Sequence, residues 1–170
     1  NATVQGNGRS TQNVTPKKLS GVEARILWET GVVRNAVIRS AEYADGRICF
    51  ETGTARGNAV IGLFDAAGTC IWSWHIWAVD YDPLSTAKTY STGAVFMDRN
   101  LGAETTSLTD VRSKGMYYQW GRKDPFVYPS SNAPSNNYTP AAVTSLEGYE
   151  FKAPGRNATL PIPTVSYTIQ

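Results

Sequence analysis

The only histidine of the chain lies within a group of three tryptophans. His75 is adjacent to Trp74 and close to Trp72 and Trp77. Histidine titrates near neutral pH, so it is the first candidate for acid–base or metal chemistry. A catalytic triad needs three mutually oriented groups, but the neighbouring sequence offers no serine nucleophile in a turn and no cysteine at ligand spacing. We interpret His75 as a hydrogen-bonded structural residue.

Four oxygen-bearing side chains in loops are the candidates for a metal site. They are Asp80, Asp82, Asp98 and Asn100. Calcium takes six to eight oxygen ligands, and these residues lack the regular acidic spacing of a calcium-binding loop. Turn and capping roles for the acidic residues explain them more simply. We therefore predict no metal and no cofactor.

A short aromatic segment between Gly115 and Gly121 is the candidate ligand site. In an extended conformation Tyr118 and Trp120 share one face and Tyr117 points the other way. Aromatic rings of this kind stack on the apolar face of a sugar, but they serve equally well as core. Arg122 follows directly and completes the candidate ligand-binding set, although a solvated turn is its simpler interpretation.

Paired carboxylates for glycoside hydrolysis are not indicated. The remaining acids of the second half lie in unrelated loops, and nothing in the sequence brings two of them to one cleft: Glu104, Asp110, Asp124, Glu147 and Glu150. The chain also lacks a glycine motif that could cradle a phosphate. We predict that the protein is not an enzyme.

The tryptophan-rich stretch, residues 70–80, has the period of a β-strand. Alternation puts Trp72, Trp74 and Ile76 on one face, which we expect to be core, and His75 and Trp77 on the other, which we expect the second half of the chain to cover. Because aromatic side chains bury a large area, we expect this strand to lie centrally in a sheet.

The elements around this strand predict a mainly β protein. Strands are expected at residues 22–29, 32–43, 47–51 and 58–64, and short turns such as Asp45-Gly46 join several of them. This rhythm favours an antiparallel, sandwich-like module over residues 1–80. Residues 81–170 are expected to form a second, loop-rich module, with a polar loop to 92, a strand at 93–98 and a helical turn within 107–114 capped by Ser107 or Thr109.

Composition limits the partners. The formal net charge of +2 comes from scattered Lys and Arg, which does not indicate nucleic acid. No apolar run is long enough to cross a bilayer, and we do not expect a membrane-spanning protein. Cys49 and Cys70 are compatible with free thiols or a disulfide.

Three segments in this order resemble a known family. They are GNAVIGLFDAAGTCIWSWHIWAVDYDP (57–83), GAVFMDRNLGA (93–103) and GMYYQWGRKDPF (115–126). They look like the C-terminal region of fimbrillin-like surface proteins of Bacteroidetes, whose second half is similar to the Fibrobacter succinogenes major paralogous domain. The resemblance covers about residues 20–126 and implies a secreted, surface-located protein with a C-type-lectin-like α+β second module. That module would be incomplete here, because the chain stops before the family's closing Cys-Pro-x-Gly-Trp-type segment.

Two functions are compatible with this resemblance. The first is a structural or adhesive subunit of a fimbria or pilus tip, assembling by strand addition through Val165, Tyr167 and Ile169, with neighbouring subunits as partners. The alternative is a carbohydrate-binding, lectin-like module that recognises host or bacterial surface glycans. An enzyme related to sulfatase-modifying factors is disfavoured, because both cysteines lie in the first module.

Overall fold

The protein is mainly β. The computed structural model describes residues 4–5, 13–14, 19–118, 124–131 and 141–145. In chain order the elements are β1 (Val4–Gln5), β2 (Asn13–Val14), β3 (Glu23–Thr30), β4 (Ile38–Ala44), β5 (Arg47–Thr52), β6 (Gly57–Phe64), β7 (Cys70–Ala78), α1 (Pro83–Thr86), β8 (Lys88–Thr89), β9 (Val95–Phe96), the 3-10 helix η1 (Val111–Lys114) and β10 (Val143–Ser145). All strand pairs are antiparallel, which confirms the predicted class.

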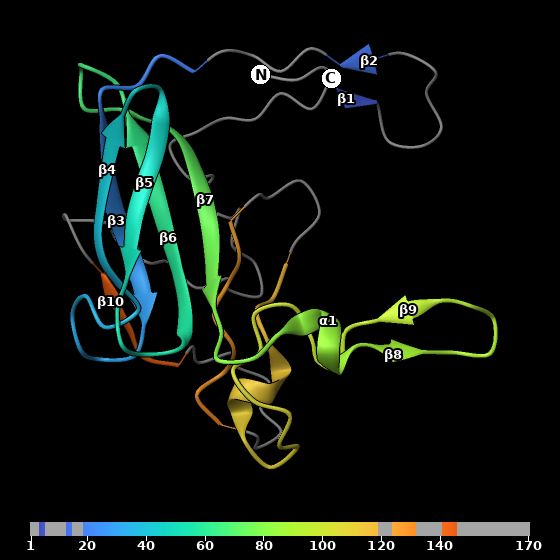
Figure 1. Ribbon diagram of the computed structural model, residues 1–170. Helices are drawn as coiled ribbons and strands as arrows, with labels where there is room; N and C mark the ends of the chain where they lie inside the picture. Colours follow the sequence, from blue (N-terminus) through green and yellow to red (C-terminus); the bar gives the residue numbers. More distant parts are fainter. Residues whose placement is uncertain (1–3, 6–12, 15–18, 119–123, 132–140, 146–170) are drawn as a thin grey trace, which may run out of the picture.

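The largest sheet has the strand order β10-β3-β6-β7, and the β4–β5 hairpin lies over one of its faces (Figure 1). The tryptophan-rich strand β7 pairs with β6 as predicted, through Ile61 opposite Trp74 and Val60 opposite His75. In the part of the chain that the structure describes, however, β7 is the terminal strand of this sheet. Within these residues β7 thus lies at the edge of the sheet and not at its centre, where it is expected.

A β-bulge in β3 divides the apolar residues of this strand between the two faces of the sheet. Ile26 pairs with Ile61, but Trp28 pairs with Val60, so Leu27 is the extra residue. A bulge inserts one residue and reverses the alternation after it. Trp28 consequently lies on the face opposite Ile26, whereas strict alternation would place both on one face.

Each face of the sheet has its own apolar core. The face under the β4–β5 hairpin buries Ala24, Ile26, Val37, Ile38, Ala59 and Ile61, with Ile76 of β7 packed at its margin. The opposite face buries Leu27, Trp28, Val60, Phe64, Met116, Val127 and Tyr128. Leu27 faces the second core by ordinary alternation from Ile26, and Trp28 joins it because of the bulge.

The second core joins the two predicted modules. Met116, Val127 and Tyr128 come from the second half of the chain and pack on Trp28 and Val60 of the sheet. Strand β10, also from the second half, pairs with β3 between Trp28 and Thr30. The two halves thus share one sheet and one core, and the division at residue 80 stays a prediction.

The segment between β3 and β4 is a loop rather than the start of the strand expected at 32–43. The fully buried carboxylate of Glu29 accepts hydrogen bonds from the backbone N–H groups of Ala36, Val37 and Ile38, at 3.1–3.2 Å. A carboxylate that satisfies three backbone donors holds them away from a strand ladder. β4 therefore begins only at Ile38, while the predicted Asp45-Gly46 turn is confirmed, with φ of 50° and 75°.

The second half contains little regular structure among the described residues. The helical turn expected within 107–114 is η1, and its N-cap is Asp110 rather than Ser107 or Thr109. The Asp110 carboxylate accepts from the N–H of Arg112 and forms an ion pair with its guanidinium, which together lower the pKa of Asp110 to about 2. The strand expected at 93–98 is the shorter β9, paired with β8 in the region read as a polar loop.

Candidate functional site

A buried polar network lies where the second half of the chain meets the sheet. Its centre is Glu104, which is 8% exposed. One oxygen of its carboxylate, Oε1, accepts hydrogen bonds from Thr30 Oγ1 and Tyr128 OH, both at 3.1 Å, and from Asn58 Nδ2 at 3.4 Å. We call Thr30, Asn58, His75, Glu104, Tyr118 and Tyr128 the Glu104 network. A buried carboxylate is tolerated when donors surround it in this way.

Asn58 links Glu104 to His75 and fixes the form of the histidine ring. The Nδ2 group of Asn58 donates to the Gly102 carbonyl at 2.9 Å and toward Glu104, so its Oδ1 is left as an acceptor for His75 Nε2 at 2.9 Å. His75 Nε2 must then carry a proton, and Nδ1 accepts from the Tyr118 hydroxyl at 3.2 Å. Both ring nitrogens are engaged, in agreement with a structural role for His75.

Two glycines allow the loops of the second half to approach this network. A Cβ at Gly102 would lie 2.5 Å from Met116 Cγ and 3.0 Å from Asn58 Oδ1, and a Cβ at Gly115 would lie 2.5 Å from the Leu101 carbonyl. Both have positive φ, 82° and 69°. Any larger residue would force the loops apart. These glycines belong to the DRNLGA and GMYYQW segments, so part of the motif sequence has a packing explanation.

The tyrosines of the network are held in their neutral form. Burial raises the pKa of Tyr118 to about 12. Burial also raises the pKa of Tyr128, and the adjacent Glu104 carboxylate raises it further because a second negative charge would be repelled. Neutral hydroxyl groups are the donors that Glu104 and His75 require.

A nucleophile is not presented to His75 by these contacts. Ser73, on the same face of β7, donates to the buried Asp124 carboxylate at 2.7 Å and is itself 2% exposed. Cys70 Sγ lies 3.3 Å from the Trp72 carbonyl, and Cys49 is an exposed free thiol on β5. On this face of β7, Ser73 and His75 contact Asp124 and Tyr118 of the second half, and His75 and Trp77 are half-buried.

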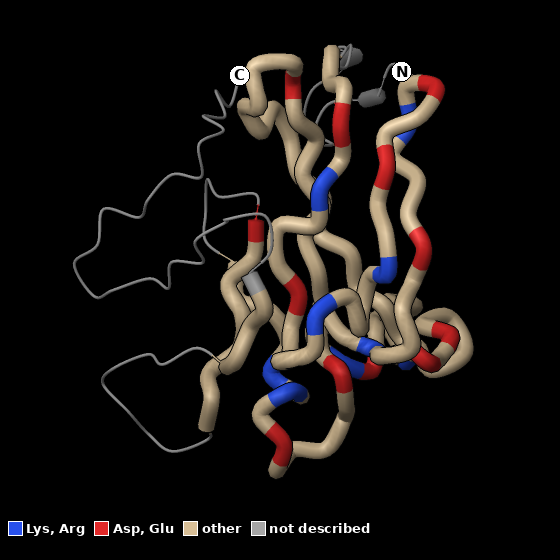
Figure 2. The backbone as a smooth tube through the Cα atoms, turned by 90° about the vertical axis from the view of Figure 1, so that its left-hand side faces the viewer, with Lys and Arg blue, Asp and Glu red and all other residues tan. Residues whose placement is uncertain are grey.

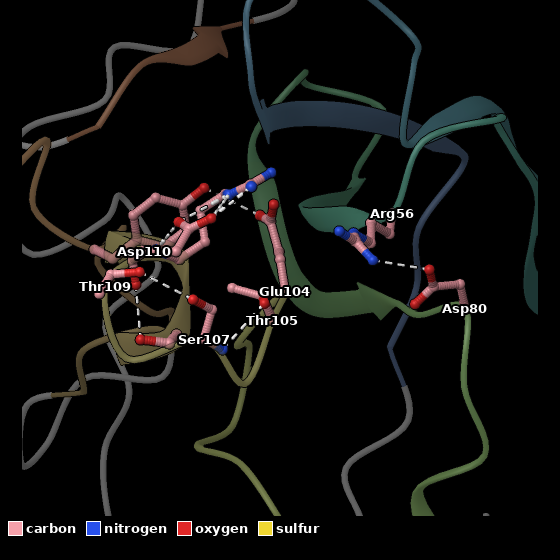
Figure 3. Close-up of polar contacts among 10 residues, drawn as sticks. Arg56, Asp80, Glu104, Thr105, Ser107, Thr109 and Asp110 are labelled. Atoms are coloured by element: carbon pink, nitrogen blue, oxygen red, sulfur yellow. Dashed lines mark hydrogen bonds and ion pairs between the residues drawn. The ribbon is translucent and has the colours of Figure 1, made fainter.

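The four metal candidates have other partners. Asp80 forms an ion pair with Arg56 at 2.8 Å (Figure 3), and Asp82 caps α1 through the Leu84 N–H. Asp98 binds the Arg99 guanidinium, which lowers the pKa of Asp98, and Asn100 donates to the Lys114 carbonyl. Among the residues described by the structure, no group of three or more His, Cys, Asp or Glu side chains is arranged to hold a metal.

Charges of both signs are distributed along the described part of the chain. Figure 2 shows Lys and Arg interspersed with Asp and Glu along the backbone. Several charges are paired locally, including Arg39 with Glu51 across β4 and β5. Within the described residues, basic side chains are thus partly neutralised by acidic neighbours, which does not favour a polyanion as ligand.

The aromatic ligand candidates are only partly within the described residues. Tyr117 is 39% and Tyr118 46% exposed, while Trp120 and Arg122 lie outside the described part of the chain. Tyr117 forms a backbone bridge with Phe126, and Tyr118 contacts the His75 ring with a centroid separation of 6.3 Å. The proposed assembly strand, Val165, Tyr167 and Ile169, also lies outside the described residues.

A second region, absent from the sequence-based candidates, carries exposed apolar side chains. Strands β8 and β9 form a hairpin that extends away from the body of the molecule (Figure 1). We call residues 88–97 the arm. Tyr90, Val95, Phe96 and Met97 are 58%, 63%, 59% and 45% exposed. The turn signal Ser91-Thr92-Gly93 next to Ala94-Val95-Phe96 could have revealed it.

Among the described residues, no helix is long and apolar enough to span a membrane. No family model, no curated protein and no solved structure matches this chain.

Proposed function

We propose that this chain is a non-enzymatic structural or adhesive subunit of a bacterial cell surface, of the fimbrial kind, which acts through contacts with neighbouring subunits. The observation that carries the proposal is the arm. It holds four large apolar side chains, each about half exposed, on a hairpin that projects from the body. An exposed group of this kind gains stability only when a partner covers it.

The isolated hairpin also needs a partner for its own stability. A two-stranded ribbon is marginally stable in water, and three or more strands or a packed face are needed to stabilise it. The described ladder of the arm contains only Lys88 opposite Phe96 and Thr89 opposite Val95. Strand addition supplies the missing strands through main-chain hydrogen bonds, with alternate side chains giving specificity.

The remaining parts of the proposal rest on the resemblance of the sequence segments. They are an extracellular or outer-membrane location, a sandwich-like first module, a lectin-like second module, and strand addition by the tail that carries Val165, Tyr167 and Ile169.

The arm is tested by removing it. We expect the purified chain to associate as its concentration rises, and replacement of residues 88–97 by a short Gly-Ser linker to abolish this association in sedimentation velocity. A matched control is the pair Val32→Ser and Val33→Ser, which removes two exposed apolar side chains from another loop. A wild-type chain that stays monomeric at millimolar concentration, and that also fails to bind a peptide of residues 164–170, would contradict the assembly function.

Carbohydrate binding is the second candidate, favoured by the exposure of Tyr117 and Tyr118 on one short segment. We expect Tyr117→Ala to remove binding on a glycan array if these rings stack on sugars. Tyr90→Ala is the matched control, since this tyrosine is exposed elsewhere. The absence of any signal from a folded sample, with and without calcium, would exclude this function.

A further inference from the structure

The two strands of the arm place apolar side chains on both of its faces. Lys88 lies opposite Phe96 and Thr89 opposite Val95, and the backbone N–H of Tyr90 donates to the Ala94 carbonyl at 2.9 Å. Phe96 and Tyr90 therefore share one face, where their rings meet edge to face at 5.5 Å. Val95 lies on the other face. Covering one face alone would leave the other in water.

One edge of the arm is equipped to pair with another strand. In an antiparallel ladder, hydrogen-bonded and non-hydrogen-bonded pairs alternate. Because Tyr90 and Ala94 are hydrogen-bonded, Thr89 and Val95 form the next, non-hydrogen-bonded pair. The N–H and C=O groups of Val95 thus point outward from the β9 edge, and in the described part of the chain β9 pairs only with β8.

The charges of the arm distinguish its two edges. Lys88, on β8, is the one charged residue within residues 88–97. Lysine on an edge strand discourages pairing at that edge. Residues 93–97 of the β9 side, Gly-Ala-Val-Phe-Met, contain neither charge nor proline. Pairing through β9 keeps the lysines of two arms on the outer strands, whereas pairing through β8 would bring them together.

We propose that the partner of the arm is a second copy of this chain, and that two arms pair antiparallel through their β9 edges about a two-fold axis near Val95. This inference rests on the proposed assembly function and names the partner. It produces a four-stranded sheet in the order β8-β9-β9-β8, which reaches the strand number needed for independent stability. A two-fold interface of this type uses the same surface in both copies.

The expected contact is small. Stable interfaces bury about 800 Å² per partner, and a pair of two-residue strands with four large side chains offers less. Dimerisation through the arms alone should therefore occur at micromolar or higher concentration. Further contacts, such as the tail strand, would strengthen it in an assembly.

The experiment compares the outward N–H groups of the two edges. Val95→Pro removes the donor of the β9 edge, and Thr89→Pro removes the corresponding donor of the β8 edge; neither donor belongs to the ladder inside the arm. In sedimentation velocity over micromolar to millimolar concentrations, we expect the wild type and Thr89→Pro to dimerise and Val95→Pro to remain monomeric. If arm replacement abolishes association but Val95→Pro dimerises normally, the inference is wrong while the proposed function stands.

Cross-linking provides a second readout that does not depend on proline. In a Cys49→Ser background, Val95→Cys should form a disulfide between two copies under mild oxidation, because directly opposed residues of an antiparallel pair lie about 5.5 Å apart at Cα. Thr89→Cys in the same background should form it at least tenfold more slowly. Equal rates for the two variants, or cross-linking of neither, would overturn the β9 pairing.

Discussion

The Glu104 network is a buried cluster of polar groups, whereas the arm is an exposed hairpin with apolar side chains. In the network, Thr30, Asn58 and Tyr128 direct their polar groups at one buried carboxylate oxygen, Oε1 of Glu104. In the arm, Phe96 and Val95 remain about 60% exposed on a projecting hairpin. Buried polar groups are normally satisfied, whereas exposed apolar groups are normally dispersed. The arm, not the network, departs from the expected pattern.

This contrast indicates where function should be sought. A residue type that could do chemistry, such as His75, is engaged through both ring nitrogens in joining the two halves of the chain. The apolar side chains of the arm, which have no chemical role, are the ones that remain exposed to solvent. Substitutions that disturb packing should therefore lower the free energy of unfolding strongly in the network and weakly in the arm. Denaturation experiments measure this difference.

The largest difference is expected between two glycines with the same φ of 82°, Gly102 in the network and Gly93 in the arm. Gly102→Ala adds a Cβ 2.5 Å from Met116 Cγ, whereas a Cβ at Gly93 has nothing within 4 Å. We expect Gly102→Ala to lower the free energy of unfolding by about 3 kcal/mol, from backbone strain and overpacking. Gly93→Ala should cost about 1 kcal/mol, from strain alone.

Urea denaturation of both variants measures this difference. Because φ is the same at the two positions, the difference between the two losses reports mainly the close packing around Gly102. Equal losses for the two variants would show that the loop around Gly102 can relax, and would remove the contrast in rigidity between the two regions.

The carboxylate of Glu104 should have the next largest effect. Glu104→Ala leaves the Thr30, Asn58 and Tyr128 donors without their shared acceptor, and we expect a loss of about 2 kcal/mol in the free energy of unfolding. Glu104→Gln keeps an oxygen acceptor and should therefore lose less of the free energy of unfolding than Glu104→Ala. Glu51→Ala, which breaks the exposed pair with Arg39, should cost less than about 1 kcal/mol. A similar loss for Glu104→Ala and Glu51→Ala would contradict a structural role for the network.

The sequence predicts the features that depend on local chemistry. The β6–β7 hairpin and the Asp45-Gly46 turn follow from alternation and turn residues, and both are present. The bulge at Leu27 is not predictable in this way, because Leu27 and Trp28 are both apolar and either can face the core. Neither alternation nor aromatic content tells which strand lies at the edge of the sheet, as β7 does among the described residues.

The network depends on contacts distant in sequence, which explains why sequence analysis missed it. Glu104 was grouped with acids in unrelated loops, and its partners at Thr30 and Asn58 come from two different strands. Only the position of β6 beside β3, and the close passage of Gly102, bring these residues together. The arm was missed for another reason, since its first strand is polar and reads as a loop.

The pH dependence of stability tests the burial of Tyr118. Its pKa is about 12 in the folded protein and about 10 in an unfolded chain. A pKa raised by folding contributes stability that is complete below pH 10 and is lost as the pH rises toward 12. Tyr118→Phe should lower stability by about 1 kcal/mol at pH 8, through the lost hydrogen bond to His75, and should show a shallower decline between pH 10 and 12.

The control for this experiment is Tyr90→Phe, because the Tyr90 hydroxyl lies on the exposed arm. It should retain the wild-type profile of unfolding free energy against pH, measured by urea denaturation between pH 8 and 12. A decline in Tyr118→Phe as steep as that of the wild type would show that Tyr118 is not protected by burial.

The smallest effect on stability is expected from the arm itself. Phe96→Ser removes a ring that is 59% exposed and meets the Tyr90 ring edge to face, a contact worth about 0.5–1 kcal/mol. At concentrations where the chain is monomeric, the variant should therefore lose less than about 1 kcal/mol. Phe64→Ser, at 8% exposed in the second core, should lose several-fold more. A large loss for Phe96→Ser in the monomer would mean that the arm packs as core, and the difference between the two regions would no longer indicate a surface kept for a partner.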